Sequence, residues 1–254
     1  MSNQTTSFAQ NVVNLNEIKE RAVTFGSRFD PVNFNHSVMG MDLLATNSQI
    51  AITAANVAIN NEKQSMGYFK MALNLLSKVI TRSFNMLVIS GANEQIVQQG
   101  RALMRDIRGQ RVAVPKPPLL VLPAIIDTVI EPITNVRHIS TSDFTLESMD
   151  RYVQFISGID HYNPNEIDLK IGALNEMLIG LKEVNVIAKR NEAVSIAARR
   201  TRDLILFTKI SGLYDVQKGV KLYTKAVFGP QSTEYISIRG FRFINKKLFI
   251  NSIG

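Results

Sequence analysis

Apolar and small residues recur at every third or fourth position through four stretches of this chain, residues 38–59, 66–80, 171–181 and 213–227. A helix turns once every 3.6 residues, so this spacing places these side chains in one stripe along each predicted helix. Such stripes have to be buried against other helices. The pattern therefore predicts a mainly α fold in which long helices pack side by side.

A near repeat adds a second constraint. The pentapeptide IRGQR occupies residues 107–111, and IRGFR occupies residues 238–242. An Asx-Pro dipeptide precedes each copy at a similar distance, at residues 30–31 and 163–164. We therefore predict an internal duplication. The predicted helical units are residues 1–111 and 143–240.

Each predicted unit has the signals of two long antiparallel helices. Asp30 and Asn163 are good N-cap residues, and the proline after each fits the first helical position. Gly91 and Gly229 suit the left-handed residue that ends a helix. The predicted fold is two duplicated antiparallel helical hairpins forming a bundle. The breaks within the hairpins are expected near Asn60-Asn61 and Ser211-Gly212, with shorter flanking helices at 14–24, 93–108 and 143–158.

Two segments depart from the helical pattern. Residues 112–142 contain five prolines and form a predicted apolar linker between the units. Residues 241–254 alternate large apolar and polar side chains on either side of an Asn-Lys-Lys turn, which predicts a small C-terminal β-hairpin. Because two isolated strands are marginal in water, the hairpin is expected to pack on the helices, pair with the linker, or add to another chain.

Several of these segments resemble a helical protein family of Bacteroidetes-type bacteria. Residues 75–111, from LLSKVITRSF to IRGQR, are similar to its first half. Residues 163–185, 195–203 and 212–243, including GLYDVQKGVKLYTKAVFGPQ, are similar to its second half. The resemblance implies a helical fold and brings no activity or cofactor with it. The linker and the tail after Phe243 depart from the family pattern, so whatever distinguishes this member is expected there.

The composition excludes several classes of functional site. The chain has no cysteine, so disulfides, cysteine zinc sites and thiolate nucleophiles are excluded. Its histidines, His36, His138 and His161, lack metal-ligand spacing. Glu166 and Asp168 are interpreted as partners of a helix N-terminus rather than a catalytic pair. With no glycine-rich phosphate loop or nucleophile elbow either, we predict no metal, no cofactor and no enzymatic activity.

The sequence also bears on location. The N-terminal segment lacks the basic and apolar regions of a secretory signal. The most apolar stretch, residues 117–133, is short for a bilayer and is interrupted by Pro123, Asp127 and Pro132. We expect no membrane span and a cytoplasmic location.

The net charge of +8 lies mostly in the C-terminal part of the chain. Acidic residues are interleaved with the basic ones between 182 and 203, and Arg199 and Asp203 have the i, i+4 spacing of an ion pair. A solvated helix face is the favoured interpretation, and an anion-binding face for nucleic acid is the alternative. The candidate anion-binding residues are Lys182, Lys189, Arg190, Arg199, Arg200 and Arg202.

Large apolar side chains on the tail are candidate assembly contacts: Phe241, Phe243, Leu248, Phe249 and Ile250. Each one contributes about 1.5–3 kcal/mol when fully buried. They could pack on the linker of the same chain or add to a neighbouring subunit, and we favour the subunit because a duplicated bundle should already bury its own core. We therefore predict a non-enzymatic structural or protein-interaction module that self-assembles as a homo-oligomer. A nucleic-acid-associated protein that uses the basic C-terminal half is the alternative.

Overall fold

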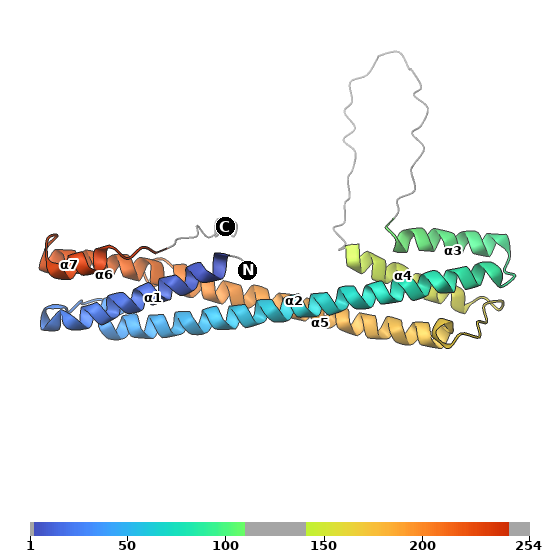
Figure 1. Ribbon diagram of the computed structural model, residues 1–254, viewed down its shortest axis with the longest axis horizontal. Coiled ribbons are helices and arrows are strands. Elements are labelled where there is room, and N and C mark those ends of the chain that lie inside the picture. The colour runs from blue at the N-terminus through green and yellow to red at the C-terminus, as the bar shows by residue number, and fades with distance from the viewer. Residues whose placement is uncertain (1–2, 110–140, 244–254) are drawn as a thin grey trace, which may run out of the picture. The chain divides into compact units, whose positions relative to one another are not determined.

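The computed structural model describes the backbone of residues 3–109 and 141–243 and the side chains of residues 8–109 and 143–243. These segments contain seven α-helices and no strand (Figure 1). The mainly α prediction is confirmed, and the helices hold well over half of the chain. They are α1 (Asn3–Thr24), α2 (Val38–Ile89), α3 (Glu94–Ile107), α4 (Thr141–Ser157), α5 (Ile171–Phe207), α6 (Leu213–Phe228) and α7 (Thr233–Arg239).

Helix α2 is one continuous helix of 52 residues, so the predicted break near Asn60-Asn61 is wrong. Asparagine has only a modestly lower helix propensity than alanine, and no glycine or proline stands at this point. The buried stripe also continues on both sides, through Ala58 and Ser65. Burial along one face therefore keeps the helix intact where the sequence suggested a turn.

The second predicted break is confirmed, because α5 ends at Phe207 and α6 begins after Gly212. A Cβ atom at Gly212 would lie 2.6 Å from the backbone nitrogen and oxygen of Thr208, so only glycine fits this turn. However, α6 leads on from α5 instead of folding back on it (Figure 1). The predicted pair of antiparallel hairpins is therefore wrong in this detail.

The long helices also begin later than predicted. Each starts after a three-residue 3₁₀ turn, η2 (Phe34–His36) before α2 and η3 (Ile167–Leu169) before α5. Pro31 and Pro164 lie outside the helices and are buried, so they are packing residues rather than first helical residues. The helix ends were predicted better: Gly91 follows α2 with φ 82°, and Gly229 follows α6 with φ 98°.

The structure describes only part of two predicted segments, the β-hairpin and the linker. Of the predicted β-hairpin, Phe241–Phe243 forms no strand, and residues 244–254 lie outside the described residues. Residues 110–140, most of the predicted linker, also lie outside them.

The chain divides into two compact units, each described here by itself. Unit 1 comprises Met1–Ser65 and Ile187–Gly254, and unit 2 comprises Met66–Val186. The division falls inside α2 and α5, so each unit combines helices from both halves of the sequence. The predicted segments 1–111 and 143–240 are therefore halves of the sequence and not compact domains.

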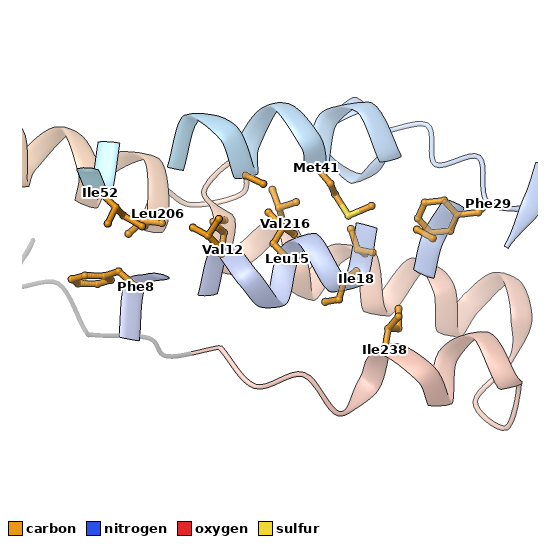
Figure 2. Packing of buried hydrophobic residues seen from close by; sticks show 14 residues of the cluster. Phe8, Val12, Leu15, Ile18, Phe29, Met41, Ile52, Leu206, Val216 and Ile238 are labelled. Atoms are coloured by element: carbon orange, nitrogen blue, oxygen red, sulfur yellow. The ribbon is translucent and has the colours of Figure 1, made fainter. Parts of the chain in front are cut away.

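The core of unit 1 is formed where α1 packs against α6 and α7 (Figure 2). Leu15 and Ile18 of α1 are fully buried, as are Met41 of α2 and Val216 of α6. At the end of this core the rings of Phe29 and Tyr223 meet edge to face, with centroids 5.4 Å apart. The cluster consists of Phe8, Val12, Leu15, Ile18, Ala22, Phe29, Met41, Ala45, Ile52, Leu206, Leu213, Val216, Val220 and Ile238.

The core of unit 2 contains a buried chain of hydrogen bonds. Tyr162 donates its hydroxyl proton to the carbonyl oxygen of Leu169 at 2.7 Å. Ser83 Oγ, 2.7 Å from Tyr162 OH, therefore donates to Tyr162 and accepts from Tyr152 OH at 3.1 Å. Burial raises the pKa of both tyrosines, which favours their neutral, hydrogen-bonding form. All three hydroxyls of this network have a partner, and the network joins α2, α4 and η3.

A substitution in the unit 1 core tests this packing. We expect Ile18→Ala to lower the free energy of unfolding by about 2–5 kcal/mol, because Ile18 is fully buried and truncation leaves a cavity. The matched control is Val23→Ala on the same helix, where the side chain is 57% exposed and little loss is expected. Urea unfolding followed by circular dichroism measures both, and equal losses would contradict the assignment of the buried face.

Candidate functional site

The six candidate anion-binding residues do not form one basic cluster. Lys182 belongs to unit 2, where its Nζ atom lies 3.0 Å from Asp150 Oδ2. The other five belong to unit 1. One of them, Lys189, has a partner within the chain.

Two of the arginines in unit 1 are held by acidic residues. Arg199 lies 3.3 Å from Glu62 of α2, and Arg202 lies 2.7 Å from Asp203. The predicted Arg199–Asp203 pair is thus replaced by two other pairs. Arg202 is only 8% exposed and stacks over the Phe8 ring at 4.4 Å, so it is a structural residue.

Arg190 and Arg200 are the candidates that stay exposed and form no ion pair with another described residue. The charge around them is nevertheless biased. The sequence segments of unit 1 contain 17 basic and 9 acidic residues, a net charge of +8, whereas unit 2 contains 12 of each. The whole excess of positive charge therefore lies in unit 1.

The first residues of the predicted assembly tail are bound within the chain. Phe241 and Phe243 pack against the unit 1 core. Asn14 donates from Nδ2 to the carbonyl oxygen of Arg242 at 2.7 Å, and Arg21 stacks over the Phe241 ring at 4.7 Å. Phe241–Phe243 therefore contacts α1 and α6 of its own chain. Leu248, Phe249 and Ile250 lie outside the described residues.

Lys221 of α6 also binds the tail. Its ammonium group donates to the carbonyl oxygen of Phe241 and lies 5.3 Å from the centroid of the Phe243 ring. Burial lowers the pKa of Lys221, because the charged form loses water around it. The sequence alone could not show that this lysine faces the tail and not solvent.

The described histidines and the carboxylates predicted beside a helix N-terminus lie in an ion pair, in a packing contact or exposed at the surface. His36 packs on Gly219, and burial lowers its pKa. Asp168 pairs with Arg82, while His161 and Glu166 are exposed. His138 lies outside the described residues. Across the described ranges, no group of three His, Asp or Glu side chains could hold a metal ion.

Each unit contains an open cleft among its described residues. The cleft in unit 1 has a volume of about 290 Å³ between α1 and α7 and brings Arg21 and Glu234 together. The cleft in unit 2 has a volume of about 210 Å³ and is lined by Lys70 and Thr145 among others. Neither lining contains a nucleophile with an adjacent base or two convergent carboxylates, so neither supports a reaction mechanism.

An exposed apolar row on α2 is the most distinctive surface feature of unit 1. Leu43, Ile50 and Val57 are 54%, 62% and 54% exposed, and they follow one another at seven-residue intervals. They lie on the side of the helix opposite Met41 and Ile52, which are buried. We refer to Leu43, Ile50 and Val57 as the α2 row.

The stretch of α2 that bears the α2 row carries no charged side chain. Residues 43–61 form an unbroken run without Asp, Glu, Lys or Arg, although a fifth of the whole chain is charged. Our sequence interpretation missed this surface because it followed only the stripe that contains Met41 and Ile52, and Leu43, Ile50 and Val57 lie outside that stripe. The uncharged run was the signal that could have revealed a second face.

Comparison with known protein families, curated proteins and solved structures finds no match for this chain. Among the helices that the structure describes, none combines the length and the apolar character needed to cross a membrane.

The contacts of the tail predict its contribution to stability. We expect Phe241→Ala to destabilise unit 1 by on the order of 1 kcal/mol, because the ring is only partly buried but covers apolar core surface. Arg239→Ala, at an exposed position two residues earlier, is the control. Chemical denaturation of the two variants is the measurement, and an unchanged midpoint for Phe241→Ala would show that the ring does not dock.

Proposed function

We propose that the protein is a non-enzymatic helical module that self-assembles, and that the α2 row is the surface through which one copy meets another. The observation that carries this proposal is the seven-residue spacing of Leu43, Ile50 and Val57 on an exposed, uncharged helix face. Apolar residues at this interval form a seam that a second helix can follow along its length.

The partner is a second copy because of charge. Unit 1 carries a net charge of +8, so two copies repel each other over most of its surface. A two-fold contact places the same patch on both subunits, and an uncharged patch can meet itself without repulsion. Depletion of charge is also the usual composition of an interface core.

The internal duplication is part of the same proposal. Two further observations support it. The halves have similar orders of elements: α1, two 3₁₀ turns, the long α2 and the short α3 in the first, and α4, one 3₁₀ turn, α5 with α6 and the short α7 in the second. Buried positions also recur at constant shifts between them: Leu15, Ile18 and Ala22 correspond to Met149, Tyr152 and Ile156, and Leu76, Ser83 and Leu87 correspond to Leu213, Val220 and Thr224.

Charge on the α2 row tests the assembly. We expect Ile50→Lys/Val57→Lys to convert the oligomer into a folded monomer, because the two facing seams would then carry like charges. Light scattering after size exclusion measures the mass, and circular dichroism checks the helix content. Val13→Lys/Val23→Lys, at two exposed positions on α1, adds the same charge elsewhere and should leave the mass unchanged. A wild-type protein that is monomeric at high concentration would refute the proposal.

Binding of nucleic acid through unit 1 is the second candidate function, favoured by the concentration of net charge there. Phosphate contacts release counterions, so affinity should fall steeply with salt. We expect Arg190→Gln/Arg200→Gln to weaken binding and to reduce the slope of log K against log salt by about 2, at about 0.9 for each contact on duplex DNA. Lys70→Gln/Lys78→Gln in unit 2 is the control. Fluorescence anisotropy at low salt decides, and absence of binding by the wild type removes this candidate.

A further inference from the structure

Each unit is made by an exchange of helices between the two halves of the sequence. Unit 1 takes α1 and the first part of α2 from the first half and α6 and α7 from the second. Unit 2 takes α4 and the first part of α5 from the second half and α3 and the last part of α2 from the first. Each half therefore carries a receiving pair of helices at its start and a donated pair at its end.

This exchange raises a problem of specificity. If the halves are duplicates, as proposed above, the two donated pairs resemble each other. The donated pair of one half could therefore also pack on the receiving pair of an identical half in a second copy. Two copies of the chain could then pair first half with first half. Pairing of a first half with a second half needs contacts that favour this combination or that penalise the pairing of identical halves.

Two adjacent positions on the donated helices differ in the way that such selection requires. On the shifts given by the buried positions, Arg82-Ser83 in the first half corresponds to Gly219-Val220 in the second. On the receiving side, Tyr152 corresponds to Ile18. The Asx-Pro dipeptides pair Tyr162 with Phe29 and Leu169 with His36.

Ser83 matches the receiving pair of the second half. There it completes the hydrogen-bond chain with Tyr152 and Tyr162, and all three hydroxyls are satisfied. The receiving pair of the first half offers Ile18 and Phe29 at these places, so a serine there would lose both tyrosine hydroxyls as partners. Val220 fits that apolar surface, and it would leave Tyr152 without its partner in the opposite combination.

Gly219 matches the receiving pair of the first half. The His36 ring occupies the space above it, and a Cβ atom at residue 219 would lie 2.2 Å from Nε2 of His36. Arg82 stands at the corresponding position of the other donated helix and would force the imidazole out. In its own place Arg82 pairs with Asp168 beside Leu169.

We propose that the dipeptides Arg82-Ser83 and Gly219-Val220 are the specificity determinants by which the two halves of the chain recognise each other. Arg82-Ser83 selects the receiving helices α4 and α5, and Gly219-Val220 selects α1 and α2. The partner of each half is the other half, in the same chain or in a second copy, and not a half of its own kind. This inference rests on the duplication that forms part of the proposed function, and not on the α2 row.

The test supplies the whole chain as two pieces. Residues 1–120 are produced with two different affinity tags, together with untagged residues 121–254, in the Ile50→Lys/Val57→Lys background so that association through the α2 row does not contribute. We expect capture of one tag to recover the second half and at least about tenfold less of the other tag, since one unpaired buried hydroxyl shifts a pairing equilibrium by roughly tenfold. Arg82→Gly/Ser83→Val in the first half should raise recovery of the other tag by roughly the same factor.

Lys78→Gly is the control for the dipeptide variant. Lys78→Gly, at an exposed position one turn earlier, introduces the same helix-weakening residue and should leave the ratio of the tags unchanged. Failure of the two halves to copurify would overturn the exchange. Equal recovery of both tags with the wild type, or an unchanged ratio with the dipeptide variant, would overturn the selection.

A second measurement uses the full chain and does not depend on the folding of its halves. Ser83→Val should lower the denaturation midpoint, because Tyr152 loses its partner. Adding Tyr152→Ile and Tyr162→Phe introduces the residue types of Ile18 and Phe29, which correspond to these tyrosines in unit 1. The triple variant should recover most of that loss. If the additional substitutions deepen the loss, the correspondence between the two units is wrong.

Discussion

The structure depends on apolar packing between helices that come from opposite halves of the sequence. In unit 1, Leu15 and Ile18 of α1 are fully buried in the same cluster as Val216 of α6 and Ile238 of α7. Neither half can bury its stripe alone in this arrangement, because the covering helices belong to the other half. The two compact units follow from this constraint, and the proposed duplication and the proposed selection between halves build on it.

Polar groups then decide which apolar surfaces meet. Burial of an apolar side chain is favourable against any apolar neighbour, so it gives little discrimination between similar partners. A buried hydroxyl is favourable only where its partner lies, as Ser83 does between Tyr152 and Tyr162. Glycine at residue 219 adds a second criterion of shape, since the His36 ring fills the space of a side chain there.

Several charged residues of unit 1 bind partners within the chain. Arg202 is buried with Asp203 and stacks on Phe8, while Arg199 ties α5 to Glu62 of α2. These contacts place two of the candidate anion-binding arginines in ion pairs within the chain. The excess charge of unit 1 remains, and the proposed contact between copies uses the stretch of α2 that carries no charged side chain.

Much of the secondary structure follows from local signals in the sequence. Helical periodicity identified the long helical segments, and Gly91, Gly229 and Gly212 were correctly placed at helix ends because their backbone requirements are local. The uninterrupted α2 was missed, since burial of one face outweighs the weak propensity of Asn60 and Asn61. The late starts of α2 and α5 were missed as well, because Pro31 and Pro164 act through packing.

The sequence by itself determined that the chain is helical, where most helices end, and that no thiolate chemistry is available. Only the tertiary structure decided which helices cover one another, because an apolar stripe can pack against any other apolar stripe of similar shape. It also decided which basic side chains form ion pairs. It placed the start of the tail against Asn14 and Lys221. These outcomes depend on contacts between residues far apart in sequence, and the spacing of residues along one helix does not specify such contacts.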